Sequence, residues 1–535
     1  MLAYRDAVRF ESGEQLRCEL LRAIDRVDHD THGDCALEAL LRAGELECAL
    51  ADAAHPSASE VAHLTDALAA RVIGARHLAE VRAASLAGLD LPDRLRVKTP
   101  EGFAYYALDP LSYARAIEQL GLIHARVAVI GVRSIGTSLG AIVSEALCAR
   151  DVLAGRISVR PSGHPWARSL RLDPHERAFI ESYAAADALF LIVDEGPGLS
   201  GSTFLSVAEA LEDVGVARER IVFLCSHSVD PERLVAENAA LRWTRYRSYA
   251  PIESAADSGN DLSAGAWRSR LYGSDQRDWP ASWTQLERVK RLSADGRHLD
   301  KFEGLPPYCD AAIARAFALE QAGFGPTLHR MRRGFARFAW LDGRPLSARD
   351  LNPTILTELA RYCAFRTRTF PATGATPAPL EEMLRVNTEE TFGIDIGDRI
   401  PLAIETPVVP DARMQPHEWS ASAGRMIKFD GHGHGDGHLL PGPTDVCWDL
   451  AGAVVEWNMD SHQEDMLVEL YERLTGARVR SRLDGFIAAY AAVRIGEMSL
   501  ARMSADELER MRIEQQRALY GCRLERQLQA RGLLD

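Results

Sequence analysis

The stretch Leu189–Phe204, LFLIVDEGPGLSGSTF, joins an apolar run to two adjacent acids, a glycine-rich segment and a cluster of hydroxyl residues. The run LFLIV is typical of a buried strand, and the residues after the loop have apolar positions at helical spacing. Residues 125–150, ARVAVIGVRSIGTSLGAIVSEALCAR, repeat this order, and residues 219–227, ERIVFLCSH, add another strand. Repeated strand–loop–helix units predict a parallel sheet whose ligands gather at the carboxyl ends of its strands.

Composition narrows the class of protein further. A chain of 535 residues is longer than one core usually organises, so two or three domains are expected. The formal charge of −14 argues against general binding to nucleic acid and would help to collect a cationic small substrate. The nine cysteines are scattered without a C-x-x-C pair, which favours reduced thiols. Apolar runs are too short to span a membrane and no signal-type segment opens the sequence, so we expect a cytoplasmic protein.

Texture along the chain predicts an α/β plus α+β protein in five regions. Residues 1–90 have helical spacing, and residues 91–250 form the parallel-sheet domain. Residues 251–280 are rich in Gly, Ser, Ala and Asp and mark a junction. Residues 281–495 combine short strands with long helices, and residues 496–535 form a charged C-terminal helix. Homodimerisation is left open by the sequence.

The opening stretch predicts a site with two chemically different ends. Its glycines allow several backbone N–H groups to face one concavity, and the following helix N-terminus adds partial positive charge. Asp194 and Glu195 would repel an anion there, but they could accept hydrogen bonds from vicinal hydroxyls or help to hold Mg²⁺. A ligand with a phosphate at one end and a diol at the other is a sugar phosphate. The residues expected to bind the phosphate are Gly196, Gly198, Ser200, Gly201, Ser202 and Thr203.

This pattern of strand, acid pair and Ser-Gly-Ser-Thr ending resembles the ribose-phosphate signature of the type I phosphoribosyltransferases, with a loop one residue longer. The resemblance covers residues 91–250. It implies that Arg133, Ser134, Ile135 and Gly136 form the pyrophosphate loop, and that residues 157–173 form a flap in which Arg160 and Arg168 neutralise charge. The implied catalytic groups of this domain are Asp194, Glu195 and Arg133.

The resemblance implies Mg²⁺-dependent displacement of pyrophosphate from 5-phosphoribosyl 1-diphosphate by a small-molecule acceptor. Mg²⁺, Arg133 and the loop amides would stabilise the leaving pyrophosphate, and flap closure would exclude water. The extra domains and the negative charge suggest an unusual acceptor, such as a hydroxyl of an aminocyclitol or aminoglycoside. His227, at the end of another strand, could contact the acceptor, although a structural histidine is more common.

The C-terminal half has a second set of chemical groups. Lys301 lies on an expected strand, Asp411 in a loop, and Asp430 at the end of the strand GRMIKFD, while Asp445 and Asp449 open a helix. A strand lysine, a loop aspartate and a strand-end aspartate are the groups that phosphoryl transfer needs. Their order over residues 281–495 resembles the aminoglycoside and choline kinase-like fold, whose two-lobed architecture is shared with protein kinases.

This second resemblance implies a role for each group. Lys301 would bind nucleotide, Asp411 would be catalytic, and Asp430 would bind the metal, with Gln415 and His417 as candidate further ligands. ATP is then a second cofactor besides Mg²⁺. The sequence departs from the family because Pro410 precedes Asp411, Pro416 stands where an asparagine is usual, and no glycine-rich nucleotide loop precedes Lys301. An active kinase and an acceptor-binding relative are both compatible with this pattern.

The segment 430–438, DGHGHGDGH, allows two interpretations. His432, His434 and His438 could bind Zn²⁺ or a similar ion, because neutral imidazoles are good ligands for such metals. The many glycines favour the other interpretation, a flexible activation-type loop after Asp430.

Three functions therefore remain open. The first is phosphoribosyl transfer with a kinase-like domain that phosphorylates or binds the acceptor. The second is a small-molecule kinase whose N-terminal half senses a ribose phosphate. The third is a non-catalytic, nucleotide-responsive adaptor.

Overall fold

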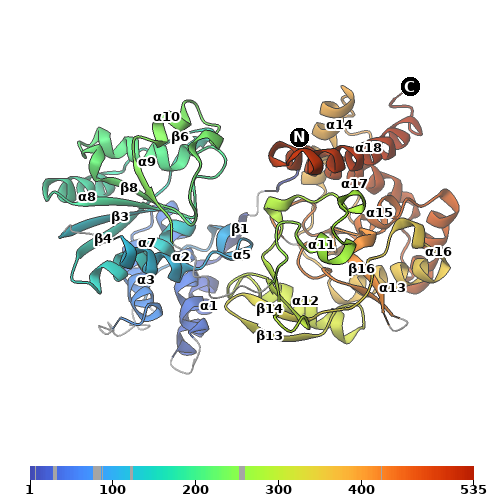
Figure 1. Ribbon diagram of the computed structural model, residues 1–535, viewed down its shortest axis with the longest axis horizontal. Helices are drawn as coiled ribbons and strands as arrows, with labels where there is room; N and C mark the ends of the chain where they lie inside the picture. The colour runs from blue at the N-terminus through green and yellow to red at the C-terminus, as the bar shows by residue number, and fades with distance from the viewer. Residues whose placement is uncertain are drawn as a thin grey trace. The chain divides into compact units, whose positions relative to one another are not determined.

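The computed structural model describes residues 1–5, 8–27, 33–75, 86, 88–120, 125–251, 260–422, 425–435 and 437–534 (Figure 1). The chain divides into two compact units. The parallel-sheet unit consists of Val8–Asp257 with Gly304–Tyr308. The antiparallel-sheet unit consists of Met1–Ala7, Ser258–Glu303 and Cys309–Asp535. Each unit is described by itself below.

The parallel-sheet unit is built on five parallel strands in the order β4-β3-β7-β8-β9. The strands are β3 (Arg126–Val132), β4 (Leu153–Val159), β7 (Leu189–Val193), β8 (Ile221–Leu224) and β9 (Arg247–Tyr249). Every residue of β7 is buried, as its continuous apolar run predicts. The predicted strand, loop and helix at residues 189–213 are confirmed.

Helices join these strands and cover the sheet. They include α7 (Ile135–Cys148), α8 (Pro174–Ala185), α9 (Ser202–Asp213) and α10 (Ala239–Trp243). Helix α8 starts with a capping box in which Asp173 accepts from the amide of Glu176 and the Glu176 side chain accepts in return. A short hairpin, β5 (Ser162–His164) with β6 (Ala167–Ser169), lies between β4 and α8.

The N-terminal helices belong to this same unit, which differs from the expected separate region 1–90. Helices α2 (Asp34–Asp52) and α3 (Ala58–Val72) pack against α7, and α1 (Gly13–Asp25) packs against α2. Strand β1 (Val8–Glu11) pairs with β2 (Leu95–Lys98), which leads to α5 (Glu101–Ala104) and α6 (Pro110–Gln119). The apolar stripes of these helices are buried within the unit rather than in a core of their own. The expectation of helix for residues 76–85 lies outside the described residues.

The antiparallel-sheet unit begins with five strands in the order β10-β11-β12-β14-β13. They are β10 (Asn260–Asp261), β11 (Lys290–Leu292), β12 (His298–Phe302), β13 (Leu328–Arg332) and β14 (Phe335–Ala339). Helix α12 (Asp310–Gln321) follows β12, and α11 (Trp267–Tyr272) lies within the segment expected to be a junction. The described part of that junction, from residue 260 onward, therefore belongs to this unit.

A helical part completes the unit and holds its largest core. It contains α13 (Pro353–Thr369), α14 (Ala378–Phe392), α15 (Cys447–Glu456), α16 (Ser461–Thr475), α17 (Arg480–Ala501) and α18 (Glu507–Gln529). Asn352 caps α13 by accepting from two backbone amides, with Pro353 as the first helical residue. Helix α17 is buried over most of its length, so α15, α14 and α18 can pack around it.

Two short antiparallel pairs connect the sheet to the helices. Strand β16 (Trp419–Ser422) pairs with β17 (Arg425–Lys428), and β15 (Pro407–Val408) pairs with β18 (Thr444–Asp445). The segment between β17 and β18 contains the Gly/His stretch. The unit thus consists of a sheet followed by a larger helical part, and the chain combines a parallel and an antiparallel sheet as predicted.

Candidate functional site

The acid pair of the parallel-sheet unit stands at the carboxyl end of β7. Asp194 and Glu195 are partly buried, and the backbone carbonyl of Asp194 accepts from the Tyr113 hydroxyl at 2.7 Å. Burial raises the pKa of Asp194 to about 7, and burial together with the Asp194 charge raises the pKa of Glu195 to about 8. Burial therefore disfavours the ionised form of both carboxyl groups, although hydrogen bonds from the backbone of Glu195 and Gly136 offset this in part for Asp194. Both carboxyl groups would gain from a bound cation or from hydroxyl donors.

The phosphate loop predicted at residues 196–203 leads directly into α9. Gly198 and Gly201 have φ of +59° and +74°, which side chains rarely allow. A Cβ at Gly201 would also lie 2.9 Å from Leu234. The first N–H groups of a helix lack intrahelical acceptors, and Ser200 Oγ accepts that of Ser202 at 3.2 Å. The loop and helix N-terminus therefore present amides and hydroxyls next to the acid pair, although binding of a phosphate stays a prediction.

The predicted pyrophosphate loop follows β3. Ser134 has φ +97°, a strained conformation for a residue with a side chain, and it caps the start of α7 at Ile135 and Gly136. A Cβ at Gly136 would lie 2.5 Å from the backbone oxygen of Val193, so only glycine allows this approach to β7. The Arg133 side chain is turned to Glu176, at 2.9 Å, and to the Ser158 carbonyl, at 3.1 Å. Its role toward pyrophosphate stays a prediction.

The segment expected to be a flap is the β5–β6 hairpin. Its turn contacts the phosphate loop, since Ser202 Oγ donates to the carbonyl of Pro165 at 2.7 Å. Arg168 on β6 donates to the Pro161 carbonyl at 3.4 Å. Arg160 lies at the base of the hairpin, where it pairs with Asp52 of α2 and donates to the Arg133 carbonyl. Arg160 thus contacts the predicted pyrophosphate loop in this structure, whereas Arg168 lies on the hairpin itself. Charge neutralisation by either arginine stays a prediction.

A pocket opens beside the predicted pyrophosphate loop, within the parallel-sheet unit. Its walls come from α2, β2, α5, Tyr308 and the start of α7 with Ser134. Glu45 lines it, with one carboxylate oxygen paired to Arg9 at 2.6 Å and the other buried without a hydrogen-bond partner. Lys98 also lines the pocket, and its charge offsets part of the rise that burial causes in the pKa of Asp194. Sequence reasoning missed this pocket because its residues are spread over distant elements.

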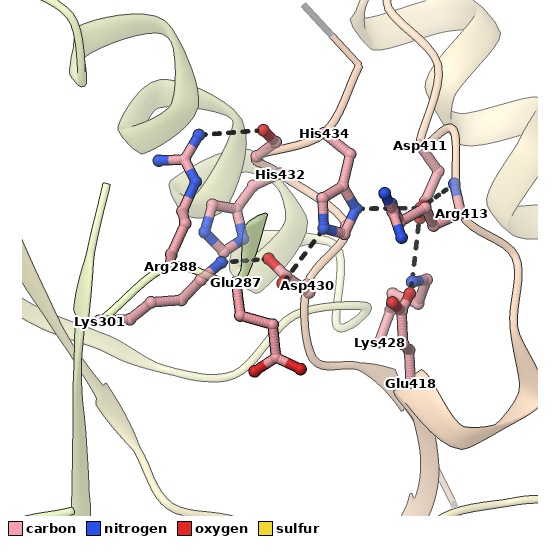
Figure 2. A network of polar contacts seen from close by, with 12 residues as sticks. Glu287, Arg288, Lys301, Asp411, Arg413, Glu418, Lys428, Asp430, His432 and His434 are labelled. Carbon is pink, nitrogen blue, oxygen red and sulfur yellow. Dashed lines mark hydrogen bonds and ion pairs between the residues drawn. The ribbon is translucent and has the colours of Figure 1, made fainter. Parts of the chain in front are cut away.

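In the antiparallel-sheet unit, three predicted residues meet around the Gly/His segment, as Figure 2 shows. Lys301 on β12 is buried and its ammonium contacts Asp430 and, at 3.0 Å, Glu303. Although burial alone would lower it, these carboxylates hold the pKa of Lys301 above its ordinary value. The same pairing holds the pKa of Asp430 well below its usual range. The structure thus places the strand lysine and the strand-end aspartate together, as the kinase-like resemblance implies.

Asp411 lies nearby and is fully buried. It accepts from the Tyr362 hydroxyl at 2.5 Å, and the Lys428 ammonium is 3.4 Å from its other oxygen. Lys428 holds the pKa of Asp411 well below its ordinary value against the effect of burial. His434 stands between the two acids, with Nε2 at 3.2 Å from Asp430 and Nδ1 at 4.0 Å from Asp411. Asp411 is therefore an ionised carboxylate covered by its neighbours.

The Gly/His segment is packed closely over this cluster, which differs from the expected flexible loop. A Cβ at Gly431 would lie 2.2 Å from the Tyr362 hydroxyl, and one at Gly435 would lie 1.9 Å from the Pro410 carbonyl. Gly431 and Gly435 therefore allow the backbone to approach Tyr362 and Pro410, while His432 and His434 face the acids. His432 is buried and 2.8 Å from Glu303. His438 instead stacks on Tyr4.

The other two predicted metal ligands lie between Asp411 and β16. His417 stacks on Trp267 with ring centroids 5.7 Å apart, and burial lowers its pKa to about 4, so its imidazole is neutral. Gln415 is buried and its side-chain oxygen has no hydrogen-bond partner. Among the described residues, the carboxylate and imidazole groups close enough to share an ion are Glu303, Asp430 and His432, and Asp411, Glu418 and His434. Metal binding by Gln415 and His417 stays a prediction.

Asp445, at the end of β18, and Asp449, in α15, both accept hydrogen bonds from backbone amides. Asp449 accepts from the amides of Asp411 and Ala412 at 2.9 and 3.0 Å, and Asp445 accepts from the amides of Glu405 and Thr406. Asp449 therefore fixes the loop that carries Asp411. Glu303, Glu418 and Lys428 also belong to the cluster and were not predicted, because only the folded chain brings them to Asp411 and Asp430.

Comparisons with known proteins find distant structural similarity over part of the chain. No family model and no curated protein matches the sequence significantly. Choline kinase LicA from Streptococcus pneumoniae is a similar solved structure at 13% identity, covering 46% of this chain and 89% of that one, with a TM-score of 0.31. A choline/ethanolamine kinase family protein from Mesorhizobium loti has 17% identity, 46% and 89% coverage and a TM-score of 0.32. An aminoglycoside phosphotransferase from Alicyclobacillus acidocaldarius has 12% identity, 46% and 91% coverage and a TM-score of 0.31.

These three structures are named as kinases or phosphotransferases, so the distant similarity concerns the kinase-like half of the prediction. The phosphoribosyltransferase half has no counterpart among them. At these TM-scores the case for any function rests on the residues of the sites themselves. In the part of the chain that the structure describes, no helix is both long and apolar enough to cross a membrane.

Proposed function

We propose that the antiparallel-sheet unit transfers a phosphoryl group from a nucleoside triphosphate, such as ATP, to a hydroxyl group of a small molecule. The observation that carries this proposal is the grouping of Lys301, Asp430 and Asp411 around one segment (Figure 2). Phosphoryl transfer needs a cation near the phosphates, an acid for the metal and an acid for the acceptor hydroxyl. These three side chains are of those types and come from a strand, a strand end and a loop.

In the proposed reaction, the bond between the terminal phosphorus and the oxygen of the leaving nucleoside diphosphate breaks, and a bond between that phosphorus and the acceptor oxygen forms. The Lys301 ammonium contacts the phosphates, and Asp411 receives the proton of the acceptor hydroxyl. A divalent cation held by Asp430 would neutralise developing charge on the phosphates. Because Asp411 has no exposed surface, the acceptor reaches it only after the segment 431–438 moves aside.

The test is release of ADP from ATP that depends on an added hydroxylated amine, in the presence of a divalent cation. Lys301→Met and Asp430→Asn should each lower kcat at least about 100-fold, because they remove charge stabilisation from the transition state. Lys290→Met is the matched control, since Lys290 stands opposite Lys301 on β11 and pairs with Glu287 instead. Equal rates for Lys301→Met and the unaltered protein would contradict the proposal.

A second candidate function belongs to the parallel-sheet unit, and the raised pKa values of Asp194 and Glu195 favour it. We propose that this unit binds a ribose 5-phosphate group, with the acid pair on the ribose hydroxyls and residues 196–203 on the phosphate. Burial disfavours the ionised form of Asp194 and Glu195. Hydrogen bonds from ribose hydroxyls would stabilise that ionised form, so such a ligand favours the two charges. The first α9 amides supply donors for the phosphate.

Phosphoribosyl transfer is the finer form of this proposal. The bond between C1 and pyrophosphate breaks, pyrophosphate leaves, and a bond from C1 to the acceptor forms. The unpaired Glu45 oxygen in the neighbouring pocket suits an acceptor with an amine or hydroxyl group, such as an aminocyclitol.

Two measurements separate the forms of the second proposal. Equilibrium dialysis with labelled ribose 5-phosphate reports binding, and acceptor-dependent pyrophosphate release reports transfer. Binding without pyrophosphate indicates a sensing unit, and neither signal contradicts both forms. Asp194→Asn with Glu195→Gln should abolish whichever signal is observed.

A further inference from the structure

Figure 2 shows the His434 imidazole between two ionised carboxylates, those of Asp430 and Asp411. His434 Nε2 is 3.2 Å from Asp430, a hydrogen-bonding distance. Its Nδ1 is buried, has no hydrogen-bond partner and faces Asp411 at 4.0 Å. In the tautomer that donates from Nε2 to Asp430, the Nδ1 lone pair points toward a negative oxygen. A positive charge at this place is favourable, whether it is a proton on the imidazole or a metal ion between the two atoms.

A third ligand atom completes the arrangement. Glu418, at the start of β16, offers a carboxylate oxygen, and the ligand atoms of Asp411, Glu418 and His434 all lie within 4.8 Å of one another. Ligands bound to one ion at about 2.1 Å are themselves separated by about 3 to 4 Å. The three groups are therefore spaced so that small side-chain rotations bring them onto one cation.

We propose that Asp411, Glu418 and His434 bind a transition-metal dication, Zn²⁺ or Mn²⁺, and that this ion occupies the carboxylate to which the proposed phosphotransfer assigns the acceptor proton. One imidazole with two carboxylates suits a borderline metal, whereas Mg²⁺ strongly prefers oxygen ligands alone. The metal site itself is argued from geometry, and its effect on catalysis, which is to withhold Asp411 from the acceptor, rests on the function proposed above.

Lys428 is the group that competes with this ion. Its ammonium hydrogen-bonds to Glu418 and lies 3.4 Å from Asp411, so it neutralises the same two carboxylates. The ammonium is also 5.7 Å from the centre of the Trp419 ring, whose face attracts cations. Binding of the metal ion requires this ammonium to leave the space between the two carboxylates. Metal binding and the Lys428 ion pairs are therefore alternatives in one place.

The proposed metal site explains why glycine and histidine alternate in this segment. Gly431 and Gly435 let the segment lie against Tyr362 and the Pro410 carbonyl, and this contact holds His434 over Asp411. His438 comes from the same segment but stacks on Tyr4 and belongs to neither group of ligand atoms. It therefore provides a matched control on the same loop.

The test is binding of Zn²⁺, Mn²⁺ and Mg²⁺ to the full chain without nucleotide or acceptor, measured by equilibrium dialysis. His434→Ala should weaken Zn²⁺ binding at least about 100-fold, because loss of supporting residues around metal sites already costs 10- to 100-fold. His438→Ala should leave Zn²⁺ binding unchanged. Equal affinity of His434→Ala and the unaltered protein, or no binding of any of the ions, would overturn the proposal.

A second measurement needs no variant and guards against a misfolded His434→Ala protein. X-ray absorption of the Zn²⁺-loaded protein should show one imidazole nitrogen with oxygen ligands in the first coordination sphere. Ligation by oxygen alone, or by several imidazoles, would also overturn the site. Because both measurements omit ATP, a metal site without phosphotransfer activity would contradict the proposed function and leave the metal site standing.

Discussion

Replacing Glu195 by Gln should stabilise the parallel-sheet unit while removing its ligand binding. Glu195 is partly buried at the end of β7, close to Asp194 and within the influence of Glu101, and its pKa rises from 4.5 to about 8. A raised pKa means that the folded protein holds the proton more tightly than the unfolded chain does. The stability contributed by that proton is complete below about pH 4.5 and is lost as the pH rises through about 8.

The magnitude follows from this difference. One pKa unit corresponds to about 1.4 kcal/mol, so the rise sets an upper bound of about 5 kcal/mol. Because the side chain is only partly buried, solvent screens some of this cost, and we expect about 2 kcal/mol at pH 8.5. For a unit of this size that is roughly 4 to 8 °C in Tm. At pH 4 the variant and the unaltered protein should melt together.

The assay is thermal unfolding of the full chain between pH 4 and 9, followed by calorimetry. Glu232→Gln is the matched control, since Glu232 is an exposed acid in the same unit. Its Tm should follow that of the unaltered protein at every pH. A Glu195→Gln protein that melts at or below the unaltered protein at pH 8.5 would refute the reasoning. It would mean that a cation or hydrogen-bond donor already satisfies the Glu195 carboxylate.

Further predictions concern the closely packed contacts. Gly435→Ala should destabilise the antiparallel-sheet unit by about 1 to 3 kcal/mol in chemical unfolding, because its Cβ would lie 1.9 Å from the Pro410 carbonyl, whereas Gly437→Ala, with open space around it, should be near neutral. Asp449→Asn should lose both activity and about 3 kcal/mol, since a buried carboxylate that holds two backbone amides is removed. Ser202→Ala should speed hydrogen exchange in residues 162–169, because the hydroxyl that holds the hairpin turn is gone.

Local sequence signals predicted most of the elements. The buried run at residues 189–193 and the apolar stripes of the N-terminal helices each specify an element through nearest neighbours. Partnership between elements was harder to predict. Nothing local in residues 34–72 shows that α2 and α3 pack on α7, because an apolar stripe names no partner.

The sites show the same division. Asp194 and Glu195 were predicted because both stand next to each other at the end of one strand. The contact between Lys301 and Asp430 was not predicted, since 129 residues separate them. The kinase-like resemblance gave each of the two residues a role of its own. Glu418 and Lys428 were missed because neither carries a motif. The role of the glycines in the Gly/His segment also depends on what lies opposite them, so flexibility and close packing cannot be told apart from composition.

The pKa values of the site carboxyl groups are lowered in one unit and raised in the other, and this difference affects ligand binding. In the antiparallel-sheet unit, lysines hold the pKa values of Asp411 and Asp430 low, so these acids stay ionised throughout the physiological range. In the parallel-sheet unit, the charges of Arg160 and Lys98 offset the effect of burial on Asp194 only in part, and the pKa values of Asp194 and Glu195 approach 7 and 8. A ligand that needs both anions must therefore release protons as it binds near neutral pH, and its affinity must rise with pH through that range. Ligands of the lysine-paired cluster must displace an ammonium group instead, so their affinity depends on the competing cation more than on the proton.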